Sequence, residues 1–156
     1  ESVKLSTNGA YTNVGSYPAQ ELLAMVDHIV RSTNIDPTAM QREFGRFTFG
    51  NLVARYPQLV EKYTSSFECI YEVDQTIHKN VRKLYPDAEL PDLNAQINAV
   101  GNKMTLEYRS SRPLLNVANG LLLGCIEYYG ESIEVEMTDL SDGKHTLGCF
   151  TLVKHG

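Results

Sequence analysis

The chain has 156 residues, 42% of them hydrophobic and 21% charged, which is ordinary for one compact domain with a buried core. Its formal net charge of −5 argues against nucleic acid or an anionic membrane as the main partner. No stretch is apolar and long enough to span a membrane, and no basic segment followed by an apolar run opens the chain. The three cysteines are widely spaced, which predicts a reducing, cytoplasmic setting without a disulfide framework.

Helical patterns dominate the first half of the chain. The first 17 residues are polar and aperiodic and indicate a loop. The apolar spacing and the start signals that follow predict a helix over residues 18–34 and a second one over 36–45, which we expect Gly45 to end. A third helix is predicted over 47–56.

A longer helix is predicted over residues 65–85. Ser65 can cap its start, and Pro86 cannot continue it. Apolar residues recur along it at three- and four-residue steps, namely Ile70, Val73, Ile77, Val81 and Leu84. His78 lies one position round from this stripe and is therefore placed beside the buried face.

After Pro91 the pattern changes from helical to alternating. We expect strands over residues 96–100 and 104–110, a helix over 114–129, and a second hairpin over 132–153. The predicted fold is a single α+β domain over residues 1–156. In it, a helical N-terminal half packs on a four-stranded antiparallel sheet, with one long helix between the two hairpins.

One face of the second predicted strand carries three hydrogen-bond donors. Side chains alternate along a strand, so we expect Tyr108, Ser110 and Arg112 to share a face. Arg109 then lies on the other face. A phenol, a hydroxyl and a guanidinium in a row suit the binding of one or two carboxylates. The row alone is weak evidence, because polar residues on one strand face are more often simply solvated.

His78 is the second candidate. A helical histidine beside an apolar stripe is more often a partly buried structural residue than a ligand. The two features together are more specific, because a macrocycle with an iron centre and two carboxylates needs one axial ligand and one anionic clamp.

Two segments resemble a known family. Tyr108, Ser110 and Arg112 are similar to the Y-x-S-x-R signature of the heme–nitric oxide/oxygen-binding domain, H-NOX, which is shared with the heme domain of soluble guanylate cyclase. The segment HKNVRKLYP, which begins at His78, resembles that family's proximal histidine helix. Pro91 falls where the family has a proline against the porphyrin. The resemblance covers residues from about 10 to the end of the chain.

The resemblance implies a site for heme b. His78 would be the proximal ligand of the iron, and Tyr108, Ser110 and Arg112 would hold the propionates. Pro91 would help to keep the heme bent. The implied fold is that of H-NOX.

The resemblance also implies a signalling role rather than an enzymatic one. In this family NO binding weakens or breaks the iron–histidine bond, and the two sides of the pocket then shift relative to each other. We therefore expect a sensor of NO, with CO as a second candidate ligand. Its signal would pass to a separate protein, in bacteria commonly a histidine kinase or a cyclic-di-GMP enzyme.

Residues on the distal side bear on gas selectivity. Oxygen-binding members place a tyrosine where this sequence has Val117, and an apolar residue offers bound O2 no hydrogen bond. The resemblance places Thr48 and Leu52 near the same distal face. NO binds ferrous heme without such a bond, so the expected sensor favours NO.

The sequence departs from the family in two further ways. It opens after the helical stretch that normally covers the distal heme face, so a second copy of the chain is one candidate cover, and a homo-oligomer is one expectation. Some relatives hold zinc in the C-terminal half. Here Leu115 and Leu140 stand at the would-be ligand positions and only Cys149 is retained, so no zinc is predicted.

Two other functions remain open at this level. The chain could be a heme-free interaction module on the same scaffold, or a heme sensor that binds O2. An enzyme is disfavoured, since Ser110 and His78 do not make a catalytic triad and no phosphate-binding loop is present.

Overall fold

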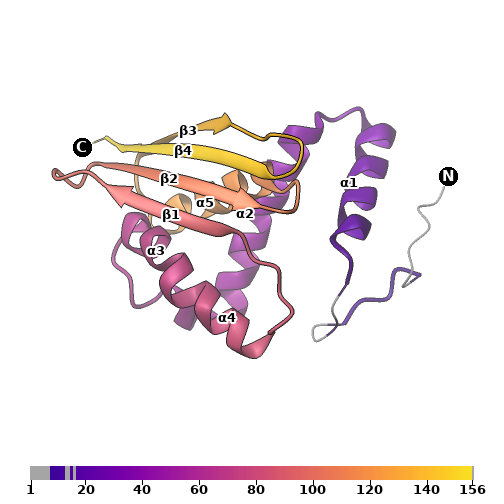
Figure 1. The fold of residues 1–156 in the computed structure, drawn as a ribbon, viewed down its shortest axis with the longest axis horizontal. Coiled ribbons are helices and arrows are strands. Elements are labelled where there is room, and N and C mark those ends of the chain that lie inside the picture. The colour runs from indigo at the N-terminus through magenta and orange to yellow at the C-terminus, as the bar shows by residue number, and fades with distance from the viewer. Residues whose placement is uncertain (1–7, 13–14, 16, 156) are drawn as a thin grey trace.

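The computed structural model describes residues 8–12, 15 and 17–155 (Figure 1). Of the loop predicted over the first 17 residues, the described ones lie in neither a helix nor a strand. The helical segments are α1 (Ala19–Thr33), α2 (Pro37–Arg55), η1 (Pro57–Leu59), α3 (Ser66–Glu72), η2 (Val73–His78), α4 (Lys79–Leu84) and α5 (Leu115–Tyr128). The strands are β1 (Asp92–Ile97), β2 (Lys103–Ser110), β3 (Ile133–Asp139) and β4 (Thr146–Lys154). None of the described helices is apolar over a length that could cross a membrane.

The four strands form one antiparallel sheet in the order β1-β2-β4-β3. Alternate residues of the two central strands are buried on one face, namely Met104, Leu106 and Tyr108 on β2 and Phe150 and Leu152 on β4. The residues between them on β2, such as Glu107 and Arg109, are exposed. The sheet therefore has one covered face and one open face, as the alternating pattern predicts, and the predicted α+β fold is confirmed.

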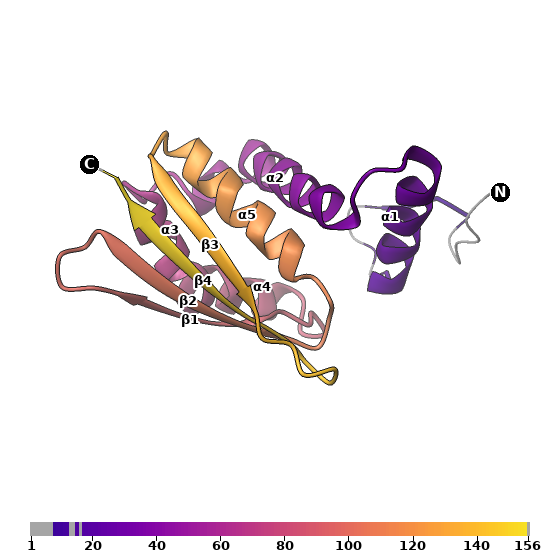
Figure 2. The same ribbon diagram turned by 90° about the horizontal axis from the view of Figure 1, so that it is seen from above.

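The helices stack on the covered face in two layers. Helix α5 lies along β3 and β4, and α2 packs on the outside of α5 (Figure 2). The run from α3 to α4 lies beside α5, against β1. Helix α1 lies apart from the sheet in both views, and its buried apolar residue is Val26.

The prediction that Gly45 ends a helix is wrong. Helix α2 runs unbroken from Pro37 to Arg55, so the two helices predicted on either side of Gly45 are one. Gly45 is buried against Gly120 of α5, and a side chain at either position would collide with the backbone of the other helix. The tight crossing of α2 and α5 explains why a poor helix former stands inside the helix.

The first predicted strand is misplaced. Strand β1 spans Asp92–Ile97 rather than 96–100, and Leu93 pairs with Tyr108 in its register. The segment around Val100, 80% exposed, belongs to the hairpin turn, where the Asn98 amide N–H donates to the Lys103 carbonyl at 2.9 Å. The early start places Leu93, two residues after Pro91, next to the covered face.

The helix predicted over 65–85 is continuous but changes its winding. Ser65 caps α3 by accepting from the Glu68 amide at 3.2 Å, and six residues of η2 then form a π-helix before α4 resumes the ordinary winding. A π-helix bonds residue i to i+5 and so holds more residues per turn. His78 is the last residue of this widened segment.

Candidate functional site

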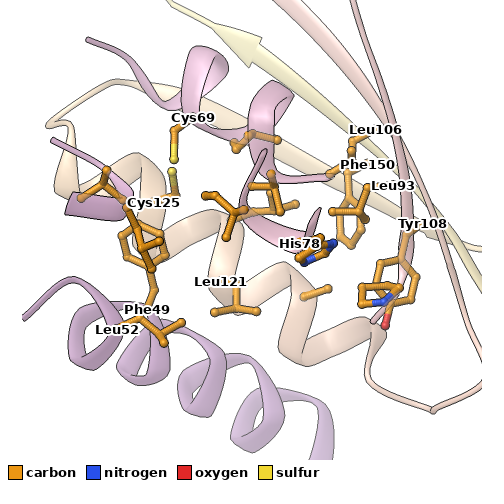
Figure 3. A pocket seen from close by; sticks show the side chains of 18 of the residues that line it. Phe49, Leu52, Cys69, His78, Leu93, Leu106, Tyr108, Leu121, Cys125 and Phe150 are labelled. Atoms are coloured by element: carbon orange, nitrogen blue, oxygen red, sulfur yellow. The ribbon is translucent and has the colours of Figure 1, made fainter. Parts of the chain in front are cut away.

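A cavity of about 210 Å³ lies between the helices and the covered face of the sheet (Figure 3). Its walls come from α2, from α3 and η2, from α5, and from strands β1, β2 and β4. Nearly all its lining side chains are aliphatic or aromatic, and the polar exceptions are His78, Tyr108 and two cysteines. Such a cavity suits a flat apolar ligand with a few polar contacts.

His78 faces this cavity from the end of η2 (Figure 3). Ile77, the preceding residue of η2, lines the cavity too. His78 therefore lies in the wall of the cavity, at the end of a π-helical segment. Segments of this kind often occur at functional sites.

The imidazole of His78 has a carboxylate behind it. Its Nδ1 lies 3.4 Å from Oδ1 of Asp74, one turn earlier, and the same oxygen is 3.7 Å from the Arg82 guanidinium. Burial lowers the pKa of His78 below its ordinary value, against the hydrogen bond and charge of Asp74, which favour the protonated ring. The lowered pKa favours the neutral ring, which is the form that binds a metal ion.

Pro91 and Tyr108 line the same cavity as His78. Pro91 directly precedes β1, and its backbone is the smallest of the influences that raise the pKa of His78. The structure thus brings together three of the residues that the sequence singled out, from η2, from the start of β1 and from β2.

Tyr108, Ser110 and Arg112 form a cluster at the edge of the cavity. Burial raises the pKa of Tyr108, against a hydrogen bond with Ser110 and the positive charge of Arg112, which lower it. Ser110 Oγ also accepts the backbone N–H of Arg112 at 3.0 Å. Strand β2 ends at Ser110, so Arg112 lies just beyond the strand rather than within it. Only Tyr108 of the three lines the cavity itself.

Sequence reasoning missed the partner of Arg112. Its Nε lies 3.1 Å from Oε2 of Glu89, and the Ser111 hydroxyl lies 3.4 Å from the same oxygen. Glu89 stands in the segment between α4 and β1, where nothing in the sequence pattern links it to a residue 23 positions away. Asp74 was also missed, although its spacing of four from His78 on a predicted helix was a usable signal.

The three predicted distal residues are placed differently from one another. Leu52 lines the cavity. Thr48 and Val117 do not, and their neighbours Phe49 and Ala118 stand in the wall instead. The Thr48 hydroxyl donates to the Phe44 carbonyl within α2 at 2.7 Å. The Val117 carbonyl faces the α2–α5 crossing.

Within the described part of the chain, no group of three or more His, Cys, Asp or Glu residues is arranged to hold a metal ion. Cys149, the residue retained from the zinc site of some relatives, lies on β4 as a free thiol.

Comparisons with known proteins point in one direction. A family model described as Haem-NO-binding matches residues 1–137. No curated protein matches the chain. A solved H-NOX from Shewanella woodyi, in its Fe(II)CO state with the compound IWP-051 bound, is 33% identical to this chain, with a TM-score of 0.80. That match covers 97% of this chain and 80% of the other.

Two further solved structures are similar. The Fe(II) unliganded H-NOX protein from K. algicida is 27% identical, with a TM-score of 0.89, over 99% of this chain and 82% of that one. An H-NOX protein from S. oneidensis in the Fe(II)NO state is 26% identical, with a TM-score of 0.80, over 92% and 80% of the two chains.

Proposed function

The chain belongs to the Haem-NO-binding, or H-NOX, family, and from this membership we propose that it is a heme-based nitric oxide sensor whose iron is held by His78. H-NOX domains bind heme and diatomic gases such as NO and CO. The observation that carries the proposal is the imidazole of His78 in the wall of a largely apolar cavity that Pro91 and Tyr108 also line.

The surroundings of His78 fit an axial ligand. Ligating histidines usually donate their second ring N–H to a carboxylate or carbonyl, which fixes the tautomer and orients the ring. Asp74 stands in that position at Nδ1, so Nε2 is the nitrogen available to iron. Arg82 shares the Asp74 carboxylate and reduces its pull on the imidazole proton.

The cluster at the cavity edge fits the propionates of heme b. Tyr108 and Ser110 offer neutral donors, and the Arg112 guanidinium offers a charge-assisted one. Arg112 can take this role by exchanging the carboxylate of Glu89 for that of a propionate. Pro91, in the cavity wall beside His78, would press on the ring and favour a bent heme.

The distal wall favours NO over O2. When bound, ferrous heme would supply an iron centre that takes up NO and thereby weakens its bond to the histidine. The lining residues that α2 and α5 contribute, among those described, are Phe49, Leu52, Val53, Ala118, Leu121, Leu122 and Cys125. None carries an oxygen or nitrogen donor, so O2 would lack a stabilising hydrogen bond. Val117 is not among these lining residues.

Signalling would begin at the proximal helix. Once released, the His78 imidazole would be free to move with η2 and α4 relative to α5. A separate protein, in the proposal a histidine kinase or a cyclic-di-GMP enzyme, would read that movement.

The primary test is an absorption spectrum of the reduced protein reconstituted with heme. We expect a Soret band that shifts on addition of NO and of CO, and no stable oxy complex in air. A stable oxy spectrum in air would indicate an O2 sensor instead. A chain that stays colourless after reconstitution would indicate a heme-free interaction module.

The ligand assignment has its own test in His78→Gly. This change should abolish the protein's axial bond, and free imidazole should restore the wild-type spectrum because it can occupy the space left by the side chain. A variant whose spectrum matches the wild type without imidazole would refute the assignment.

A further inference from the structure

Two cysteines that the proposed function does not use lie in the wall of the same cavity. Cys69 on α3 and Cys125 on α5 are 2% and 3% exposed and both line the cavity. Figure 3 shows their sulfur atoms pointing toward one another from the two helices, in a different part of the cavity from His78. Both are free thiols.

The two thiols differ chemically because they interact. A hydrogen bond from the Cys125 thiol lowers the pKa of Cys69, against the effect of burial. The same interaction, together with burial, raises the pKa of Cys125. The thiolate is the nucleophilic form of cysteine, so Cys69 is the attacking residue and Cys125 stands ready as the second thiol.

We propose that Cys69 and Cys125 are a redox-active pair that hydrogen peroxide converts into a disulfide joining α3 to α5. The Cys69 thiolate attacks one peroxide oxygen, the O–O bond breaks, and the departing hydroxide takes up a proton to leave as water. The resulting sulfenic acid is attacked by the Cys125 sulfur, the S–S bond forms, and a second water leaves. Two thiols thus lose two electrons in total, and one peroxide becomes two waters.

The position of the pair gives this bond a structural consequence. Helix α3 continues directly into η2, which carries His78, while α5 packs against α2 on the far side of the cavity. A disulfide between Cys69 and Cys125 would therefore tie the His78 side of the cavity to α5. Such a tie would restrict the movement of His78 on which gas signalling depends, and this consequence alone rests on the proposed function. Formation of the disulfide itself needs no heme.

Cys149 provides an internal control. It lies on β4, where its register partners are Glu107 and Thr138, whose side chains belong to the open face of the sheet. Cys149 is not part of the cavity wall that holds the other two thiols. Its oxidation therefore shows that peroxide has reached the protein.

The test is a peroxide titration of the full chain, run with and without reconstituted heme, followed by denaturation, alkylation and peptide mass spectrometry. We expect a linked Cys69–Cys125 peptide pair, two hydrogens lighter than the reduced pair, that disappears on treatment with dithiothreitol. Cys149→Ser should form the same link. In Cys125→Ser, Cys69 should instead be trapped as a sulfenic acid by dimedone.

The proposal is overturned if Cys69 and Cys125 remain alkylatable at peroxide doses that oxidise Cys149, or if every disulfide found includes Cys149. Because the chain is tested in both states, a failure to bind heme leaves this result readable. Formation of the link in a colourless protein would support the redox pair while refuting the heme sensor.

Discussion

At the scale of single residues, two carboxylates orient the side chains of His78 and Arg112. Asp74 fixes the ring of His78, and Glu89 holds the guanidinium of Arg112 at 3.1 Å. The sequence pointed to His78 and to the row of Tyr108, Ser110 and Arg112, because these residues stand in a recognisable pattern. It did not point to Glu89, because that contact exists only once the segment before β1 folds back beside the end of β2, whereas Asp74 could have been found from its spacing of four from His78.

Glu89→Gln should slow heme loss. The Glu89 carboxylate competes with a propionate for Arg112, and removing its charge leaves the guanidinium available. The pair is partly exposed, so the competing attraction is worth only about 0.2–1 kcal/mol, or up to about five-fold in rate. Transfer of heme to an excess of apomyoglobin measures the rate.

The matched control for this change is Glu107→Gln, on the open face of β2, which accepts from Asn94 at 2.9 Å instead. It should leave the rate unchanged. Equal effects of the two changes would mean that net charge, rather than competition for Arg112, controls heme retention.

Arg112→Ala should have the opposite and larger effect. It removes a charge-assisted hydrogen bond to a propionate, worth about 1.5–3 kcal/mol, so heme loss should accelerate roughly ten- to hundred-fold. Arg109→Ala removes the same charge from the exposed side of β2 and should change the rate little. If the two alanine variants lost heme equally fast, the assignment of Arg112 to the propionates would fail.

At the scale of elements, the errors of sequence interpretation fall at particular places. Hydrophobic periodicity located the helix layers and both hairpins, because each element buries one face, although it placed the first strand too late in the chain. It failed where two elements contact each other closely, as at Gly45, or where the winding changes, as in η2. A π-helical segment leaves no mark in residue spacing, because apolar residues three, four and five apart all occur on buried helices.

Gly45→Ala should destabilise the fold through the α2–α5 crossing. A Cβ at this position would collide with the Val117 carbonyl oxygen, and backbone cannot move aside cheaply. We expect a loss of about 2–3 kcal/mol in the free energy of unfolding, measured by urea denaturation. The same variant should weaken heme binding, because α2 and α5 both line the cavity proposed to hold the heme.

Gly50→Ala is the control on the same helix. Its Cβ would have nothing within 4 Å, so the substitution should instead stabilise α2 by about 0.5–1 kcal/mol. A loss of stability at both glycines would show that helix geometry, not the crossing, requires them.

At the scale of the whole molecule, one partly buried carboxylate joins three elements far apart in the chain. Glu131, 13% exposed, follows α5, and its Oε2 accepts the Ser66 backbone N–H at the start of α3 at 2.8 Å and the Ser66 hydroxyl. Its Oε1 accepts from Lys154 Nζ at the end of β4 at 2.6 Å. No sequence pattern predicts this junction, because its three residues meet only when α3, α5 and β4 are packed together.

This junction should make stability depend on pH. Although burial alone would raise it, the hydrogen bonds from Lys154 and Ser66 hold the pKa of Glu131 below its ordinary value. A group whose pKa is lowered by folding stabilises the fold above its unfolded pKa, about 4.3 for Glu, and that contribution is lost as pH falls through the folded value.

Glu131→Gln should therefore lower the free energy of unfolding by about 1–3 kcal/mol at pH 7, because it weakens charged hydrogen bonds to a fully buried serine and to Lys154. The difference from wild type should hold down to about pH 5 and shrink below about pH 4, where the carboxylate takes up a proton first in the unfolded wild type and, at lower pH, in the folded protein. Urea denaturation at pH 7, 5 and 3.5 measures it. Glu136→Gln, on the open face of β3, should give a parallel curve at all three values. If Glu131→Gln were also parallel to wild type down to pH 3.5, the carboxylate would contribute no pH-dependent stability, and the three elements would be joined by packing alone.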